Sequence, residues 1–262
     1  MDLALCHIDE KSLIATVTVN RPEVLNALDV ATAQALQAVV APLAARTDLR
    51  CIVFNGAGRA FMAGGDLAGF AADFDKASDT VNALLDALEC VIAVFRHHPA
   101  PVLASVHGAV AGAGVSLVAA CDLVVAAENT QFLLAYNKIG APPDCGGSYF
   151  LPRLIGERKA AALMYLSETW SAAQAKDNGL INRVVSDDQL ASTTAKLAET
   201  IAQGPTSAFS QYKALVRDGH HKSLSEQLAA ERKAFCDATK TDDFRAGVTA
   251  FIARAKVTFK GR

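Results

Sequence analysis

The residues with the clearest capacity for chemistry lie between His107 and Ser148. This stretch opens with a run of mostly glycine and alanine, from Gly108 to Gly114. Such small residues let backbone N–H groups approach a ligand closely, and a helix that begins near Gly114 would add its own free N–H groups at the same place. Backbone N–H groups gathered in this way stabilise an oxyanion. The run therefore predicts a site where negative charge develops on an oxygen atom.

A single carboxylate follows this run, flanked by turn residues. Asp144 stands in the segment PPDCGG, residues 142–147. It is a candidate acid/base, but Pro-Asp also favours a turn or the N-cap of a helix that begins near Gly146. Cys145 is interpreted as a packed thiol, because the surrounding sequence offers no histidine partner for a nucleophile.

A second glycine-rich stretch covers Gly56 to Leu67. It holds four glycines within ten residues, directly after an apolar run typical of a strand. The spacing does not fit a dinucleotide-binding fingerprint, and the lysine and hydroxyl pair of a phosphate-binding loop is absent. Together with the glycine/alanine run and Asp144, this loop predicts an active site for acyl thioesters. A plain glycine-rich turn is the alternative interpretation.

The elements that would position these loops alternate between strand and helix. Apolar, β-branched runs predict strands, and apolar residues at helical spacing predict helices. The alternation indicates an α/β fold with a largely parallel sheet, and near residue 200 the pattern becomes helical only. Strands are predicted at 12–20, 50–55, 101–106, 123–126, 131–134 and 182–185, and helices from Asp29 and at 78–97, 117–121, 146–154, 157–166, 171–179, 187–203, 206–218, 223–238 and 241–256. His97 and His98, after the helix at 78–97, are interpreted as cations at its C-terminus.

Composition and charge exclude several classes of function. The net charge of the 262 residues is −2, without a long basic block, which argues against nucleic acid as a partner. The longest apolar runs are of strand length, and the first residues lack a secretory pattern, so no association with a membrane is expected. The six cysteines form no CxxC pair, which predicts no metal site. A reducing, cytoplasmic location is the simplest expectation.

Separate segments of the chain resemble the crotonase superfamily, the family of enoyl-CoA hydratases and isomerases. The resemblance runs in order over about residues 10–260. It is specific for the fold and less specific for the reaction. The segments that carry it are 20–28 (NRPEVLNAL), 60–67 (AFMAGGDL), 101–114 (PVLASVHGAVAGAG), 121–122 (CD), Phe132, 151–156 (LPRLIG) and 172–185 (AAQAKDNGLINRVV).

The resemblance implies a crotonase-like spiral of ββα turns with a C-terminal helical region, divided into residues 1–200 and 201–262. It implies an acyl-CoA thioester as substrate, with coenzyme A as part of that substrate and no separate cofactor. It also implies self-association through the C-terminal region, as a trimer or as a dimer of trimers.

The same resemblance assigns expected roles to individual residues. The thioester oxygen is expected to accept hydrogen bonds from the backbone N–H groups of Gly65 and Ala113. Asp66 is expected to shape the loop around Gly65. Contacts with coenzyme A are expected from Val24, Ala27, Ala63 and Leu67, and, across a subunit boundary, from Phe251 and Lys260.

The chain departs from the hydratases of this family at two positions. Those hydratases use two glutamates, where this chain has Ser116 and Tyr136, and neither side chain exchanges protons readily near neutral pH. Isomerases of this family carry one acid near Asp144, in a similar local sequence. The resemblance thus favours an enoyl-CoA isomerase with Asp144 as acid/base and with Ser116 and Tyr136 in or beside the pocket. The alternatives are an atypical enoyl-CoA hydratase, an isomerase or hydrolase of aromatic-ring acyl-CoA esters, and a CoA-ester-binding subunit without catalytic activity.

Overall fold

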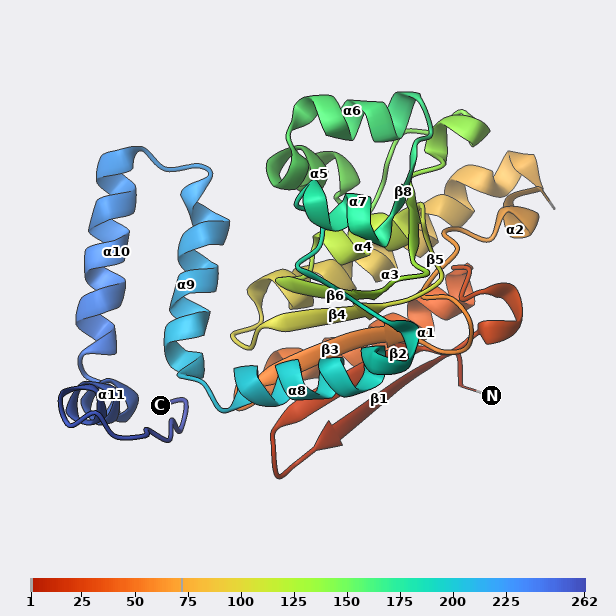
Figure 1. Ribbon diagram of the computed structural model, residues 1–262. Coiled ribbons are helices and arrows are strands. Elements are labelled where there is room, and N and C mark those ends of the chain that lie inside the picture. The colour runs from red at the N-terminus through yellow and green to blue at the C-terminus, as the bar shows by residue number, and fades with distance from the viewer. Residues whose placement is uncertain (1, 72) are drawn as a thin grey trace.

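A six-stranded sheet forms the centre of the computed structural model, which describes residues 2–71 and 73–262. Its strands lie in the order β1-β2-β3-β4-β6-β9 (Figure 1). β1 runs antiparallel to β2, and all other neighbouring strands are parallel. The strands are β1 (Ala4–Asp9), β2 (Ile14–Val19), β3 (Cys51–Gly56), β4 (Val102–Val106), β6 (Leu123–Ala127) and β9 (Arg183–Val185). The predicted parallel sheet is confirmed, with one antiparallel edge strand that the sequence pattern did not predict.

A smaller sheet carries part of the glycine/alanine run. Its strands are β5 (Ala109–Ala111), β7 (Gln131–Leu133) and β8 (Thr169–Ser171), in the order β5-β7-β8. β5 is parallel to β7, and β8 is antiparallel to it. β5 therefore fixes the direction in which the run enters the following helix, α4 (Ala113–Ala119).

All but one of the remaining helices follow the predicted pattern, with ends shifted by a few residues; the short helix Leu67–Ala71 was not predicted. Figure 1 shows α1 and α3 on one face of the six-stranded sheet and α8 on the other. The helices are α1 (Val30–Val40), α2 (Leu67–Ala71), α3 (Ala77–His97), α5 (Gly147–Ile155), α6 (Glu157–Tyr165), α7 (Ala172–Asp177), α8 (Leu190–Ala202), α9 (Thr206–Gly219), α10 (Leu224–Ala238) and α11 (Asp242–Ile252).

Strand β3 illustrates how the core is divided between the two faces of the sheet. Its side chains alternate, as the pleat of a strand requires. Ile52 and Phe54 enter the large core with α1 and α3, whereas Cys51 and Val53 enter a smaller core beneath α8. Phe54 also meets Phe61 edge-on, with ring centroids 5.3 Å apart. That contact anchors the glycine-rich loop after β3 in the core.

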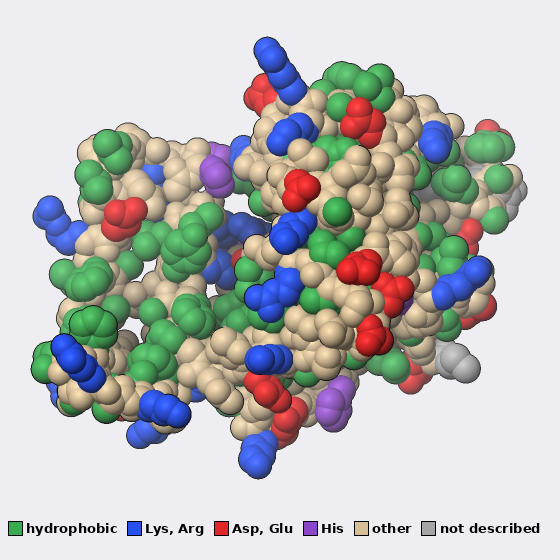
Figure 2. Space-filling model, in the orientation of Figure 1, with side chains coloured by type: hydrophobic (Ala, Val, Ile, Leu, Met, Phe, Trp, Pro, Cys, Tyr) green, Lys and Arg blue, Asp and Glu red, His purple; other side chains and the backbone are tan. Residues whose placement is uncertain are grey.

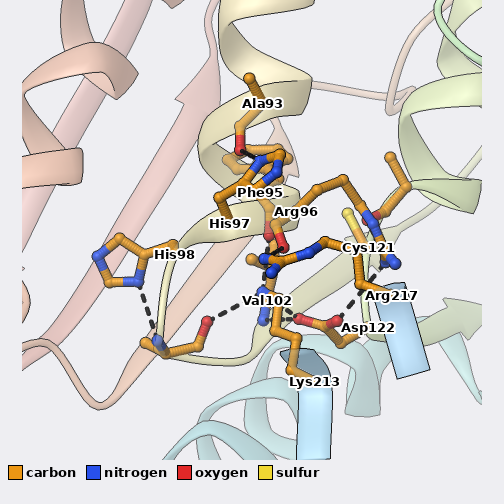
Figure 3. A network of polar contacts seen from close by, with 12 residues as sticks. Ala93, Phe95, Arg96, His97, His98, Val102, Cys121, Asp122, Lys213 and Arg217 are labelled. Carbon is orange, nitrogen blue, oxygen red and sulfur yellow. Dashed lines mark hydrogen bonds and ion pairs between the residues drawn. The ribbon is translucent and has the colours of Figure 1, made fainter. Parts of the chain in front are cut away.

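A buried polar network joins α9 to the rest of the chain (Figure 3). The Lys213 ammonium lies 2.7 Å from an Asp122 carboxylate oxygen and donates to the Phe95 and Ala100 carbonyl oxygens at 2.7 and 3.2 Å. Burial lowers the pKa of Lys213, and the charge of Asp122 opposes part of that shift. Beyond this network, α9, α10 and α11 extend to one side of the molecule (Figure 1).

The interpretation of His98 as a cation at a helix end is wrong. Its side chain is buried, Nδ1 accepts a hydrogen bond from the Ala100 N–H at 3.0 Å, and Nε2 lies 3.1 Å from the Leu43 carbonyl oxygen. Since Nδ1 accepts, the ring is neutral and donates through Nε2. Burial, and then the charge of Lys213, lowers the pKa of His98. His97 does remain exposed at the end of α3.

No helix within the described part of the chain combines the length and apolar character needed to cross a membrane.

Candidate active site

The two glycine-rich stretches run side by side in the same direction, joined by a parallel β-bridge between Met62 and Val110, with their backbones in contact. Gly64 and Gly112 both have positive φ, +94° and +51°, and a Cβ on Gly112 would lie 3.4 Å from the Gly64 Cα. Two hydrogen bonds join the stretches: the Met62 N–H donates to the Ala109 carbonyl at 3.0 Å, and the Ala111 N–H donates to the Met62 carbonyl at 2.9 Å. Only glycine combines this backbone conformation with so close an approach.

Two polar side chains from the segment after β2 hold the Gly56–Leu67 loop. The buried amide of Asn26 donates to the carbonyl oxygens of Ala57 and Ala60, both at 2.8 Å. The Arg21 guanidinium lies 2.9 Å from an Asp66 carboxylate oxygen. Asp66 is therefore engaged in an ion pair beside the loop, and the shaping role expected for it stays a prediction. The role of the arginine and asparagine was missed, although both belong to a segment that the sequence singled out.

The backbone N–H groups of Gly65 and Ala113, just after this pair of stretches, have no backbone hydrogen-bond partner among the described residues. Leu28 pairs on either side of Gly65, because its N–H donates to the Gly64 carbonyl and its carbonyl accepts from the Asp66 N–H, both at 2.8 Å. That pairing leaves the Gly65 N–H unused, and Ala113 is the first residue of α4. Within residues 2–71 and 73–262, neither N–H group has a backbone acceptor. Gly65 and Ala113 line a common cavity of about 120 Å³.

Asp144 lines the same cavity. Its carboxylate does not cap α5, since the N-cap is Gly146 and no side chain caps that end. Instead, the Tyr136 hydroxyl donates a hydrogen bond to Oδ1 of Asp144. The N-cap interpretation is therefore wrong, whereas the turn interpretation agrees with the Gly147 N–H, which donates to the Asp144 carbonyl at 2.8 Å. The acid/base role of Asp144 stays a prediction.

Tyr136 is a neutral hydrogen-bond donor in this environment. Burial, followed by the negative charge of Asp144, raises the pKa of the phenol well above its ordinary value. Ser116 approaches the same phenol and opposes part of the rise. The Ser116 hydroxyl is buried and has no hydrogen-bond partner of ordinary geometry among the described residues. It packs against Gly147, where an added Cβ would lie 2.5 Å from Oγ.

A larger cavity of about 630 Å³ adjoins the first one. Tyr136, Ile139 and Asp144 line both cavities, so the carboxylate stands at their boundary. The larger cavity is bounded by apolar and aromatic side chains of α3 and α5 and by a few charged groups. Among its lining residues are Val81, Leu85, Glu89, Ile92, Arg96, Tyr149 and Phe150.

The residues expected to contact coenzyme A fall into two separate regions. Ala63 and Leu67 line the small cavity, and Val24 and Ala27 lie on the segment that packs against the same loop. Phe251 is 86% exposed on α11, and the Lys260 N–H donates to Asp243 in the C-terminal tail. Figure 1 shows α11 on the opposite side of the molecule from α2 and β5. Within one chain, the site therefore lacks the last two residues.

Comparisons with known proteins agree with this architecture. The family model described as enoyl-CoA hydratase/isomerase matches residues 9–262. The 1,2-epoxyphenylacetyl-CoA isomerase of Escherichia coli (strain K12) is 34% identical over 263 residues, which is 100% of both chains. The trans-2-decenoyl-[acyl-carrier-protein] isomerase of Streptococcus mutans is 28% identical and covers 95% of each chain. A crystal structure of enoyl-CoA hydratase from Mycobacterium smegmatis superposes with a TM-score of 0.91 at 30% identity, over 99% of both chains. These structures confirm the expected α/β fold with its C-terminal helical region.

Proposed function

The chain belongs to the enoyl-CoA hydratase/isomerase family, and we propose that within it the protein is an isomerase that shifts the double bond of an enoyl-CoA. One observation carries this proposal. Gly65 and Ala113, whose N–H groups have no backbone acceptor among the described residues, line one cavity together with Asp144. An oxyanion site and a single base at one place are what a proton shift next to a thioester carbonyl requires.

The proposed reaction moves one proton between two carbon atoms. Asp144 removes a proton from the α carbon of a 3-enoyl-CoA, and the electron pair of that C–H bond forms an enolate. The enolate oxygen accepts hydrogen bonds from Gly65 and Ala113, each worth about 3–4 kcal/mol of barrier by analogy with other oxyanion sites. The protonated carboxyl then returns the proton to the γ carbon, which leaves the double bond between the α and β carbons. Coenzyme A remains part of the substrate, and no further cofactor takes part.

The side chains around Asp144 favour isomerisation over hydration. Hydration by the two-glutamate route needs a second carboxylate to activate water. The two positions concerned hold Ser116, whose hydroxyl is buried, and Tyr136, whose phenol is neutral because burial raises its pKa. A double-bond shift needs only one carboxylate and no water. Hydration with atypical acids, and simple binding of CoA esters without turnover, are the competing functions.

A ring-containing acyl group is the second candidate substrate within the same chemistry. The relative from Escherichia coli is named for an isomerase of 1,2-epoxyphenylacetyl-CoA. The larger cavity, with about 630 Å³ and with Tyr149 and Phe150 in its wall, offers room and aromatic surface for a cyclic group. These two observations support including ring-bearing esters in any substrate panel.

Self-association as a trimer, or as a dimer of trimers, belongs to the same proposal. Large apolar side chains are exposed on the C-terminal helices, and Figure 2 shows hydrophobic atoms gathered over that part of the surface. An exposed apolar surface of this kind marks an interface between proteins. In such an assembly, Phe251 and Lys260 would reach the coenzyme A bound to a neighbouring subunit. The side chains concerned include Tyr212 (70% exposed), Leu224 (75%), Phe235 (67%), Phe251 (86%) and Ile252 (76%). A cytoplasmic location is proposed with it, since all six cysteines are free thiols.

The decisive experiment compares Asp144→Asn with the wild type on 2-enoyl-CoA and 3-enoyl-CoA esters. We expect the wild type to convert the 3-enoyl esters, without incorporating ¹⁸O from labelled water. We expect kcat of Asp144→Asn to fall about 100- to 10,000-fold, with the affinity for the CoA ester nearly unchanged in calorimetry. Asp86→Asn, an exposed carboxylate of α3, is the matched control and keeps full activity. Undiminished turnover by Asp144→Asn, or ¹⁸O in the product, contradicts the proposal.

A further inference from the structure

We propose that Tyr136 is a positioning residue that fixes one carboxylate oxygen of Asp144, so that the other oxygen alone carries the proton between the two substrate carbons. This inference rests on the proposed function, because it names the device that orients the base in that reaction. The carrying observation is the hydrogen bond from the Tyr136 hydroxyl to Oδ1 of Asp144, at the boundary of the two cavities.

The two oxygens of Asp144 have different surroundings. Oδ1 accepts the phenol hydrogen bond, whereas Oδ2 accepts no hydrogen bond of ordinary geometry from the described part of the chain. The Cys145 thiol also interacts with this carboxylate; burial, followed by the charge of Asp144, raises the pKa of the thiol, so it is a neutral neighbour of the base. Tyr136 is 7% exposed, so its hydroxyl has little water to bond with in place of the carboxylate. A carboxylate held at one oxygen cannot rotate freely about its last bond. Oδ2 is thereby directed as the one available base.

The backbone on both sides of the pair is shaped to bring the two side chains together. Ala135, directly before Tyr136, has φ of +61°, and Cys145, directly after Asp144, has φ of +50°. Each of these L-residues in the left-handed region costs about 1–2 kcal/mol. Such conformations persist where the surrounding structure enforces them, and they cluster at functional sites.

Backbone hydrogen bonds supply that enforcement. The Ala141 N–H donates to the Tyr136 carbonyl at 3.1 Å, and the Gly147 N–H donates to the Asp144 carbonyl at 2.8 Å. The first bond closes the short 3₁₀ helix that holds the phenol, and the second closes the turn into α5. The backbone is thus fixed at both residues, at the points where the two side chains leave the chain.

The phenol orients the base without exchanging protons itself. Burial, followed by the charge of Asp144, raises its pKa above the ordinary value, so the hydroxyl keeps its proton near neutral pH. The proton taken from the α carbon therefore resides on Oδ2 and returns from the same atom to the γ carbon. Because the α and γ carbons are the two ends of one conjugated, planar dienolate, one oriented oxygen on one face of it can serve both carbons in turn. A mobile carboxylate would lose that proton to solvent more often.

The test is Tyr136→Phe, which removes the hydroxyl and keeps the ring that fills the site. We expect kcat for a 3-enoyl-CoA to fall about 10- to 100-fold with little change in KM, on the scale of a misoriented catalytic group. With a substrate deuterated at the α carbon, the fraction of label found at the γ carbon is expected to fall below that of the wild type.

Two further variants make the outcome unambiguous. Tyr165→Phe removes a hydroxyl from a ring that is 75% exposed, and it is expected to behave as the wild type. Site-specific replacement of Tyr136 by 3-fluorotyrosine keeps a strong donor at this position, and it is expected to retain the label transfer of the wild type. If Tyr136→Phe keeps the wild-type kcat and label transfer while Asp144→Asn is inactive, the positioning role is refuted and the proposed function stands. If Asp144→Asn is active, the proposed function itself fails.

Discussion

The importance of the close backbone contact between the two glycine-rich stretches can be tested by adding one methyl group at Gly64. In Gly64→Ala, the new Cβ would lie 3.2 Å from the Ala111 carbonyl oxygen, and the alanine would have to adopt φ of +94°. The neighbour on that side is backbone, which cannot rotate away as a side chain would. The variant therefore strains the backbone directly before Gly65, the residue whose N–H is proposed as an oxyanion donor.

Two costs follow from this geometry. An L-residue at a left-handed φ costs about 1–2 kcal/mol of stability. The close contact must in addition be relieved by a shift of a few tenths of an ångström, and the Gly65 N–H moves with it. A misplacement of about 1 Å at a catalytic group costs about 100-fold in rate. For the smaller shift we expect kcat/KM to fall about 10- to 30-fold, which corresponds to about 1.4–2 kcal/mol of barrier.

Gly179→Ala is the matched control. Its φ is +84°, and a Cβ there would meet the Leu154 carbonyl oxygen at an ordinary distance of 3.6 Å. The control thus carries the backbone cost but does not press on the site. Turnover of a 3-enoyl-CoA and urea unfolding would be measured for both variants. We expect both to lose stability and only Gly64→Ala to lose activity.

Equal activity of the two variants, with a similar loss of stability in each, would refute this reasoning. It would mean that the Gly65 N–H keeps its position without the close backbone contact at Gly64. Loss of activity in both variants would show that general destabilisation, and not the position of the donor, governs turnover.

Two further predictions concern the buried polar groups beneath α9. In Asp122→Asn, Lys213 stays buried without its counter-charge, and we expect urea unfolding to show a loss of about 3 kcal/mol in the free energy of unfolding. The double variant Asp122→Asn/Lys213→Met is expected to recover part of that loss. Equal losses in the single and double variants would contradict the coupling of the two charges. His98 has a folded-state pKa below the ordinary 6.5, so the unfolded chain binds a proton that the folded chain does not in the window from 6.5 down to that lowered value. The free energy of unfolding should therefore decrease as pH falls through this window, less steeply in His98→Asn, and with the wild-type slope in His97→Asn.

The parts of the fold that could be predicted are those whose sequence pattern follows from burial alone. β4 is buried at every position, so its run of apolar residues identifies it without further context. β1 was missed because only Ala4 of its six residues is buried, and the others alternate between partial and full exposure. β5 and β8 have three residues each, and they are held by pairing with β7 that no local pattern encodes.

The candidate site divides in the same way. The glycines at 64, 65, 112 and 114 indicated a close approach of backbones at the site, because such contact requires small residues. The partner of Asp144 could not be predicted, since Ala135 and Cys145 adopt left-handed conformations that their residue types disfavour. His98 was misread for a related reason: a position after a helix suggests a cation, and only the tertiary fold reveals that Leu43 and Ala100 enclose the ring.

Under the proposed mechanism, the choice between hydration and isomerisation depends on the partner of Asp144. A second carboxylate beside the first would be an acceptor, and like charges at such a distance make it costly for both groups to be ionised. Tyr136 is a neutral donor instead, so it supports the charge of Asp144 without competing for the proton. A site with two acceptors can share one water molecule, whereas a site with one acceptor and one donor directs a single base at the substrate. Under this mechanism, replacing an acid by a phenol changes the reaction that the same oxyanion site supports. The pairing of the two glycine-rich stretches that forms the site stays the same.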